Sequence, residues 1–449
     1  MKTNISAKIA RPVPLTHEGA MASRINPEQA LRRSIMSCML FENEFYEDGI
    51  SIAERIAYLV PQIKAEIVAE MAIEAREKMK LRHIPLWLVR NMAALATHKH
   101  VVAKTLERVI QRADELTEFL ALYQLGRTGT KKLSKLSKQV QKGLALAFVK
   151  FDEYSLAKYD QKTDIKLRDV LFLTHAKPKD EAQAEMWKRL ISGNLKIPDT
   201  WEVEISASKD KKSSWERLLR ENKLGALALL RNLRNFQESG VQETLVFGAL
   251  QKMKTERILP FRFISAAKYA PQWEAQIEQA MFKCLANADK LQGKTALVVD
   301  GSGSMFGTPI SNKSELDRFD AAAALAILLR EICEQVNIIV FSNDAFFVPA
   351  RRGFALRDII HKNAQQGGTN IQNGIDETNQ SGLYDRIIVI TDEQSHQRIS
   401  APPCNAKGYF VNVASNQNGV GYDQWVHIDG WSEAIIDYIR EYEKTCGVD

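Results

Sequence analysis

The period of the hydrophobic pattern changes once along the chain, near residue 288, and no other feature constrains the fold as much. Before this point apolar residues recur at intervals of three and four, as in "PEQALRRSIMSCMLF" and "VVAKTLERVIQRADELTEFLALY", which is typical of amphipathic helices. After it come short β-branched runs, namely "TALVVD", "VNIIVFS", "YDRIIVITD" and "AKGYFVNVA". The sequence therefore predicts two different architectures in succession.

The helical part spans residues 26–288, where strand signals are almost absent. Helices joined by short links over this length favour a solenoid, because each pair of helices hides its apolar face only against its neighbours. We therefore predict an all-α, HEAT-like helical-repeat domain over residues 26–288, preceded by an N-terminal extension of residues 1–25.

The last part, residues 289–449, alternates strand runs with helices such as the Ala-rich "RFDAAAALAILLREICE". Buried strands that alternate with helices are typical of a doubly wound, largely parallel α/β sheet. In such folds ligands bind at the carboxyl ends of the strands.

The formal net charge of +6 hides opposite balances in the two parts of the chain. Residues 1–290 hold 48 Lys and Arg against 35 Asp and Glu, a net charge of +13, while residues 291–449 hold 13 against 20, a net charge of −7. The first part is therefore expected to bind a polyanion. The alternative is that these charges only keep the two domains soluble.

Two further features of the composition narrow the class of protein. No apolar run approaches the roughly eighteen residues needed to cross a bilayer, so we expect a cytoplasmic protein without a membrane partner. The five cysteines are scattered and form no CxxC pair, which argues against a disulfide framework and a structural zinc site.

The stretch "LVVDGSGSMFG" places polar side chains directly after a predicted strand. Asp300, Ser302 and Ser304 alternate along the chain, so their side chains can project toward one point in an extended loop. Thr369, in "QQGGTNIQNGI", and Asp392, which closes "RIIVITDEQ", stand at matching strand ends. Hydroxyl and carboxylate oxygens suit Mg²⁺ or another small divalent cation. The pattern therefore predicts a metal site.

This Asp-x-Ser-x-Ser, Thr and Asp arrangement resembles the metal-ion-dependent adhesion site of von Willebrand factor A domains, which are Rossmann-like. The resemblance implies that Ser302, Ser304 and Thr369 contact the metal, while Asp300 and Asp392 hold its waters. A sixth position would remain for the carboxylate of a protein partner or another oxygen ligand.

Two other interpretations of the same stretch remain open. One is a polar turn that merely ends a strand. The other is a hydrolase nucleophile elbow of the G-x-S-x-G type, but the second glycine is missing after either Ser302 or Ser304. A general base would have to come from His361, His396 or His427, and nothing in their spacing favours one of them.

Lysines form a stripe in the segment "TKKLSKLSKQVQKGLALAFVKF". They recur at helical spacing, and an apolar stripe of Leu133, Leu136, Val140 and Leu144 lies elsewhere on the same predicted helix. A solvated helix face is the alternative to a phosphate-binding one, although basic clusters recur in "KDKKSSWERLLRENK" and "LLRNLRNF". Aromatic residues that could stack on bases are Trp187, Trp201 and Trp215. The lysines of the stripe are Lys131, Lys135, Lys138 and Lys142.

Several blocks, among them "ALRRSIMSCMLFENEFYEDG", "LRDVLFLTHAKPK" and "SWERLLRENKLGALALLRNLRNF", resemble successive blocks of the Ro 60 kDa autoantigen family, the TROVE-domain proteins. The resemblance runs from about residue 26 to the C-terminus, and at this length it suits a bacterial, Ro-sixty-related member. It implies a closed ring of helices followed by a von Willebrand A domain.

The resemblance also implies function and site residues. A small noncoding Y RNA would bind the basic outer surface, single-stranded 3′ ends of misfolded RNAs would pass through the central hole, and an exoribonuclease such as polynucleotide phosphorylase would be a partner. Lys150 and His175 match residues of the RNA-binding surface. The chain departs from the family one turn after Lys150, where Asp152, Glu153 and Tyr154 stand in place of a basic residue.

The sequence thus predicts a non-catalytic, RNA-binding scaffold with a metal-bearing module. A protein-interaction adaptor with an acidic ligand at the metal site is the first alternative. A metal-dependent nuclease is the second, although such sites usually cluster several carboxylates around the metal.

Overall fold

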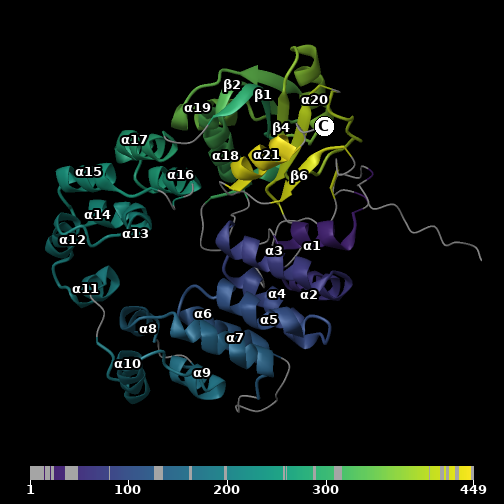
Figure 1. Ribbon diagram of the computed structural model, residues 1–449. Helices are drawn as coiled ribbons and strands as arrows, with labels where there is room; N and C mark the ends of the chain where they lie inside the picture. The colour runs from purple at the N-terminus through teal and green to yellow at the C-terminus, as the bar shows by residue number, and fades with distance from the viewer. Residues whose placement is uncertain are drawn as a thin grey trace, which may run out of the picture. The chain divides into compact units, whose positions relative to one another are not determined.

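The computed structural model divides the chain into two compact units, a helical unit of residues 27–288 and 431–449 and an α/β unit of residues 1–26 and 289–430 (Figure 1). The residues that it describes are 15, 21, 25–35, 49–79, 81–125, 135–160, 164–196, 200–255, 258, 260–286, 290–307, 316–403, 405–414, 419–420, 424–429 and 434–445.

The helical unit is a succession of short and medium helices. Its first half holds α1 (Pro27–Ile35), α2 (Gly49–Leu59), η1 (Val60–Gln62), α3 (Ala65–Glu77), α4 (His83–Ala94), α5 (Lys99–Val109), α6 (Asp114–Gln124), α7 (Lys138–Val149), α8 (Glu153–Tyr159), α9 (Leu167–Thr174) and α10 (Glu181–Ser192). Its second half holds α11 (Trp201–Ala207), α12 (Lys211–Arg220), α13 (Ala226–Arg231), α14 (Leu233–Glu238), α15 (Glu243–Lys252), α16 (Pro260–Tyr269), η2 (Pro271–Trp273), α17 (Glu274–Leu285) and α21 (Ala434–Thr445).

Local sequence explains where many of these helices begin. At five of the helix starts that the structure describes in this unit, a Ser, Asp or Thr side chain accepts a hydrogen bond from a backbone N–H of the first turn, which satisfies a donor that the helix itself leaves without a partner. These capping residues are Ser137, Asp152, Asp180, Thr200 and Asp210.

Packing between successive helices builds one continuous apolar core through the first half of the unit, from Leu31 in α1 to Leu190 in α10. Helix α5 lies at its centre and packs on α3, α4 and α7. Helix α7 approaches α5 closely at Gly143, where an added Cβ would lie 2.9 Å from the carbonyl oxygen of Ala103.

A buried ion pair fixes the junction between α5 and α6. The Arg76 guanidinium donates to Glu115 Oε1 at 2.6 Å and to the carbonyl oxygen of Val109 at 2.9 Å. The other oxygen of Glu115 accepts from the backbone N–H groups of Gln111 (2.8 Å) and Arg112 (3.0 Å). One carboxylate therefore satisfies the start of α6 while its arginine partner satisfies the end of α5.

The α/β unit is built on a six-stranded sheet with the strand order β3-β2-β1-β4-β5-β6, in which only β3 runs antiparallel to its neighbour. The strands are β1 (Leu291–Asp300), β2 (Cys333–Phe341), β3 (Ala345–Val348), β4 (Arg386–Thr391), β5 (Lys407–Asn412) and β6 (Val426–Asp429). Helix α18 (Arg318–Ile332) packs on β1, β2 and β4 and against α19 (Gly353–Asn363), while α20 (Ile371–Gln380) packs on β1, β2 and β3.

The structure confirms the predicted fold class, a helical domain followed by a largely parallel α/β sheet. All four predicted strand runs are strands, and the Ala-rich segment is α18, with a capping box between Asp317 and Asp320. The short strands β3 and β6 carried no clear signal. The last segment differs from the predicted boundaries, since residues 431–449, which hold α21, group with the helical unit. Within the described part of the chain, no helix is long and apolar enough to cross a membrane.

The contact at Gly143 predicts the effect of one methyl group. In Gly143→Ala the new Cβ would press on the backbone of α5, and such overpacking costs roughly 1–3 kcal/mol. This cost exceeds the gain of about 1 kcal/mol expected for alanine in a helix. Urea unfolding followed by far-UV circular dichroism should therefore show a lower midpoint.

Gly248 in α15 is the matched control, because an added Cβ there meets no atom within 4 Å. Gly248→Ala should raise the midpoint through helix propensity alone. If both variants shift the midpoint in the same direction, the packing argument for Gly143 is wrong.

Candidate metal centre and nucleic-acid interface

The carboxyl edge of the sheet brings the two predicted aspartates to adjacent strand ends. Asp300 ends β1, and Asp392 follows the last residue of β4, its parallel neighbour, with Val299 paired to Ile390. Both aspartates are completely buried. Two carboxylates without access to water need hydrogen bonds or a cation to be stable as anions.

Backbone hydrogen bonds tie the predicted serines to the threonine loop. The N–H of Gly301 donates to Phe341 at the end of β2, and its carbonyl accepts from Gln366 N at 3.0 Å. The N–H of Gly303 donates to the Gly367 carbonyl at 2.8 Å. A Cβ at position 303 would lie 2.9 Å from the Gln366 carbonyl oxygen, so glycine is required for this approach.

The same loop is tied to the segment that follows β4. The carbonyl of Thr369 accepts from His396 N at 2.9 Å, and the N–H of Asn370 donates to the Ser342 carbonyl at 2.8 Å. The structure thus gathers the three segments that carry the predicted metal residues around the ends of β1, β2 and β4.

The oxygen atoms of the site are arranged by a few short contacts. The hydroxyls of Ser302 and Ser304 lie 3.3 Å apart. Asp300 accepts from the N–H of Ser302 at 2.9 Å and from the hydroxyl of Thr391 at 2.5 Å. Ser302 and Thr369 are buried. This set of hydroxyls and carboxylates fits a small hard cation.

Arg318 is a buried residue at the start of α18 that the sequence analysis missed. Its Nη1 lies 3.6 Å from Asp392 Oδ2, so this guanidinium balances part of the negative charge of the site. Asp392 also accepts from the N–H of Gln394 at 3.2 Å. No pattern of spacing marks Arg318, because it reaches the site from the helix that follows the β1 loop.

Burial, and after it the nearby charge of Asp392, raise the pKa of Asp300 to about 7. The hydrogen bonds from Ser302 and Thr391 act in the opposite direction but are weaker effects. Among the described residues, no three His, Cys, Asp or Glu side chains cluster so as to hold a metal ion. A metal at this edge would therefore depend on hydroxyl oxygens.

Two of the three histidines weighed as a general base for serine chemistry have other neighbours. His361 lies edge-on to the rings of Phe306 and Phe319. His427 Nδ1 lies 2.9 Å from Glu393 Oε1, and its ring stacks on Phe410. His396 is exposed and donates its backbone N–H to Thr369.

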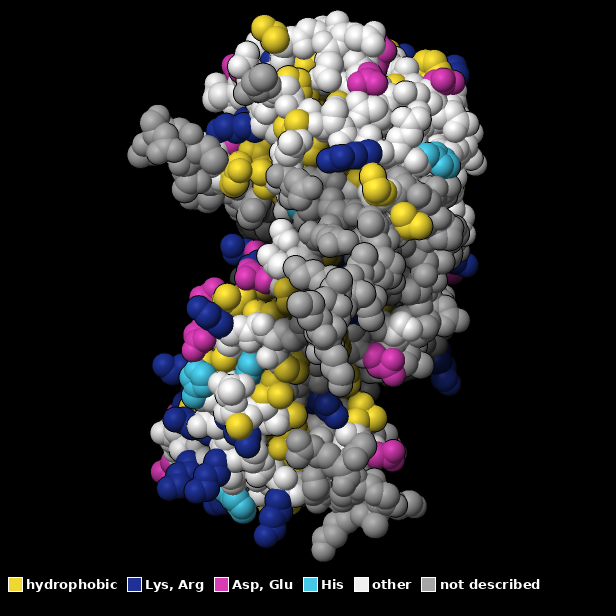
Figure 2. All heavy atoms as spheres, turned by 90° about the vertical axis from the view of Figure 1, so that its right-hand side faces the viewer, with side chains coloured by type: hydrophobic (Ala, Val, Ile, Leu, Met, Phe, Trp, Pro, Cys, Tyr) yellow, Lys and Arg dark blue, Asp and Glu magenta, His cyan; other side chains and the backbone are white. Residues whose placement is uncertain are grey.

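In the helical unit, part of the predicted lysine stripe lies on α7. Lys135, Lys138 and Lys142 are exposed, while Val140 and Leu144 are buried on the opposite side of the helix. Lys131 lies outside the described residues. On the face shown in Figure 2, Lys and Arg side chains gather over the lower part of the helical unit.

Lys150 has a structural task that the sequence did not reveal. Its amine donates to the carbonyls of Glu107 and Ile110, the latter at 2.5 Å, at the C-terminal end of α5. Although the residue as a whole is exposed, its amine is partly covered, and this burial lowers the pKa of Lys150. Lys150 therefore satisfies the end of a helix.

His175 ends α9 with a left-handed backbone (φ 50°), and its side chain is exposed. Its N–H donates to the Leu171 carbonyl at 3.1 Å. Phe172, one turn earlier, is 54% exposed. This end of α9 therefore presents an imidazole and an aromatic ring to solvent.

Two of the three tryptophans suggested for base stacking are core residues. Trp187 packs edge-on against Phe148, and Trp215 against Phe236, and both tryptophans are buried. Their large apolar area stabilises the fold more when it is buried in the core than it would on a surface. Phe172 and Tyr154, which is 48% exposed, are aromatic residues of the same unit that do reach solvent.

The family model described as "TROVE domain" matches residues 15–192 and 188–318. Telomerase protein component 1 of Mus musculus is 24% identical over 313 residues, and that of Rattus norvegicus is 38% identical over 89 residues. These matches cover 51% and 18% of this chain, but the chain spans only 12% and 3% of those relatives.

Among solved structures, the Deinococcus radiodurans RO (RSR) protein is similar in fold. The TM-score is 0.59 at 18% sequence identity, and the match covers 91% of this chain and 97% of that chain. The likeness therefore extends over nearly the whole architecture.

The raised pKa of Asp300 predicts how stability depends on pH when divalent cations are removed. In the folded protein the carboxyl group of Asp300 keeps its proton up to about pH 7, whereas in the unfolded chain it releases the proton near pH 3.8, its ordinary pKa. Stability should therefore fall as the pH rises from about 4 to about 7, by up to about 4 kcal/mol from this residue. In the variant Asp300→Asn this side chain cannot ionise. The difference in unfolding free energy between the variant and the wild type should therefore grow in favour of the variant as the pH rises across this window.

Thermal unfolding of both proteins in EDTA, across this pH range, measures the difference. Asp376→Asn, at an exposed position of α20, is the control and should follow the wild type. Parallel curves for Asp300→Asn and the wild type would show that Asp300 ionises normally.

Proposed function

The chain belongs to the TROVE-domain family, and from that premise we propose that it binds small structured noncoding RNA, of the Y RNA type, on the basic surface of its helical unit. It is a Ro-like, RNA-binding protein without catalytic activity. We propose further that the helices close into a ring whose central hole takes single-stranded 3′ ends of misfolded RNAs. Its role is then quality control, processing or decay of noncoding RNA.

The exposed lysines of α7 are the observation that carries this proposal. Lys138 and Lys142 stand one turn apart on the solvent side of a helix whose other side is buried against α5. Like charges at this spacing repel each other by a few tenths of a kcal/mol. A phosphate backbone reverses that cost, because each neutralised phosphate releases counterions.

Recognition on such a surface depends on shape more than on sequence. Lysine side chains contact phosphates, which position an RNA but carry no base information. Selectivity for structured RNA then comes from the geometry of its helix and of its unpaired segments. Binding is expected to tolerate changes of sequence and to weaken with salt.

The α/β unit has a different role in this proposal. Mg²⁺ would be held by the hydroxyls of Ser302, Ser304 and Thr369, with Asp300 and Asp392 holding its waters, and bound there it would supply an electrophilic centre for an anionic ligand. The ligand is an acidic side chain of a protein partner, and an exoribonuclease such as polynucleotide phosphorylase is the partner that the family resemblance implies.

The same site supports a second candidate, an adaptor that binds only proteins, because the net charge of −7 in residues 291–449 does not attract RNA. The material that copurifies from native cells distinguishes the two functions. RNase-sensitive absorbance at the nucleic-acid maximum supports the RNA scaffold, and protein free of nucleic acid supports the adaptor.

Charge reversal on α7 tests the RNA surface. In Lys138→Glu/Lys142→Glu two phosphate contacts are lost, so the affinity for a structured RNA should fall. The slope of log K against log salt should become shallower by up to about 2, since each contact contributes about 0.9. Filter binding at several salt concentrations measures both quantities.

Arg351→Glu/Lys362→Glu is the matched control, with the same change of charge at two exposed positions of the α/β unit. It should leave the slope unchanged. Equal effects of the two double variants would mean that net charge alone, and not the α7 surface, attracts the RNA.

Magnesium should stabilise the protein if the site binds it. A ligand at a hundred times its Kd raises the unfolding free energy by about 2.7 kcal/mol, so the wild type should melt at a higher temperature in Mg²⁺ than in EDTA. Ser304→Ala removes one proposed ligand at a partly exposed position and should lose this increase. The control Ser381→Ala, after α20, should keep it, and a wild type indifferent to Mg²⁺, Mn²⁺ and Ca²⁺ would refute the metal assignment.

A further inference from the structure

Arg318 places a buried positive charge beside the candidate metal site. It is the first residue of α18, the helix that packs on β1 and β4 (Figure 1), and its side chain is only 7% exposed. Arginine is almost never buried this deeply unless a partner of opposite charge accompanies it. Asp392 is such a partner, since its Oδ2 lies 3.6 Å from Nη1 of Arg318.

Asp392 therefore has to serve both this guanidinium and the proposed metal. One of its oxygens accepts from the N–H of Gln394 at 3.2 Å, while Oδ2 faces Arg318. The distance to Nη1 exceeds the roughly 2.7–3.2 Å of an N–H···O hydrogen bond, so at this atom the two groups attract each other by charge. A metal-bound water held by Asp392 would meet the charge of Arg318 on the same carboxylate.

The other charged side chains around Arg318 have partners of their own. At the start of α18, Asp317 and Asp320 each accept from the backbone N–H of the other. Beyond β4, Glu393 Oε1 lies 2.9 Å from His427 Nδ1. The charge balance of the metal site is therefore set by its two aspartates and by Arg318.

These three groups determine the net charge of the site in each state. With both carboxylates ionised, two aspartates and one arginine give a charge of −1. A divalent cation changes this charge to +1, and a single anionic ligand then brings it to zero. Uncompensated charge of either sign is costly in a buried site, because little water is present to solvate it. The state with cation and anion bound together is therefore favoured.

Without Arg318 the same count favours a different state. The site would carry a charge of −2 before a divalent cation binds and a charge of zero afterwards, so the cation alone would neutralise it. An anionic ligand would then add an uncompensated negative charge. Arg318 therefore decides whether the cation alone neutralises the site, or the cation and an anion together.

We propose that Arg318 is a built-in counter-ion that makes binding of a divalent cation at this site depend on an anionic ligand, a carboxylate of a protein partner. The inference rests on the metal site and the acidic ligand of the proposed function, and it adds a coupling between them. By linkage, the anion tightens binding of the cation by the same factor as the cation tightens binding of the anion. Occupancy of the metal site is thereby tied to the presence of the partner.

Calorimetric titration of the full chain with Mg²⁺ alone tests the coupling, in sodium chloride and in sodium acetate of equal ionic strength. Acetate carries the carboxylate of an acidic side chain. A buffer of about pH 8 lies above the pKa of about 7 of Asp300, so both aspartates are ionised. The wild type should bind Mg²⁺ about tenfold more tightly in acetate than in chloride.

Three variants assign the effect to the charge of Arg318. Arg318→Met should bind Mg²⁺ in chloride about tenfold more tightly than the wild type, and acetate should no longer tighten its binding. Arg318→Lys keeps a positive charge and should keep the dependence on acetate. Arg398→Met, the same loss of charge at an exposed position of the segment after β4, should behave as the wild type.

Melting temperatures separate this role from a purely structural one. In Arg318→Met two buried carboxylates lose their counter-ion, so the variant should melt below the wild type in EDTA and gain more from Mg²⁺ than the wild type does. An equal loss in EDTA and in Mg²⁺, with an unchanged Kd for Mg²⁺, would assign Arg318 to packing and overturn the proposal. If the variant does not fold, the two salts still decide the question with the wild type.

Failure of the coupling and failure of the metal site give different results. A wild type that binds Mg²⁺ equally well in the two salts overturns the coupling and leaves the metal site intact. A wild type that binds neither Mg²⁺ nor Mn²⁺ in either salt overturns both. Equal tightening in Arg318→Met and Arg398→Met would show that the overall charge of the unit sets the affinity, which also overturns the role of Arg318.

Discussion

The buried ion pair between Arg76 and Glu115 is the contact on which the helical unit depends most. It joins α3 to α6 and at the same time satisfies backbone groups on both sides of the α5–α6 junction. Loss of one partner from such a pair costs more than an ordinary mutation, because the other charge would remain buried without compensation. The direction in which α6 leaves α5, and with it the position of Arg112, follows from this contact.

Much of the architecture could be predicted from the sequence, because the spacing of apolar residues along the chain distinguishes helices from strands. The residues of the candidate metal site were predicted for a related reason. Asp300 and Asp392 each follow a strand, and parallel strands place such ends at one edge of a sheet. Spacing along the chain was therefore enough to bring together segments that lie far apart in sequence.

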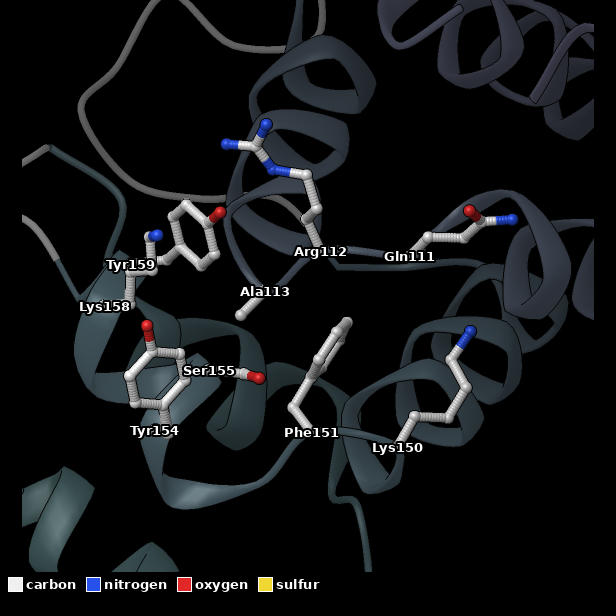
Figure 3. Close-up of a pocket in the computed structure, with 9 residues that line it drawn as sticks. All are labelled: Gln111, Arg112, Ala113, Lys150, Phe151, Tyr154, Ser155, Lys158 and Tyr159. Carbon is white, nitrogen blue, oxygen red and sulfur yellow. The ribbon is translucent and has the colours of Figure 1, made fainter. Parts of the chain in front are cut away.

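Other features depend on side-chain packing, which sequence pattern does not report. Trp215 and an exposed tryptophan look the same in a sequence, and only the neighbours of Trp215 show that it is buried. In the sequence Lys150 is only one of several basic residues of its segment. The structure shows that its amine donates to two carbonyls at the end of α5. Arg318 reaches its site, and a pocket forms between residues 111–113, the end of α7 and α8 (Figure 3), from elements whose proximity no local motif marks.

Because α21 groups with the helical unit, residues 289–430, which hold the six-stranded sheet, are inserted between two segments of that unit, whereas residues 1–26 of the α/β unit precede both. An insertion is tethered at both ends, so when it unfolds it becomes a closed loop and gains less conformational entropy than a free tail would. Removal of the segment from residue 431 onward would open that loop. The last helix can therefore oppose unfolding of the sheet through chain connectivity, independently of any side chain that the sheet contains.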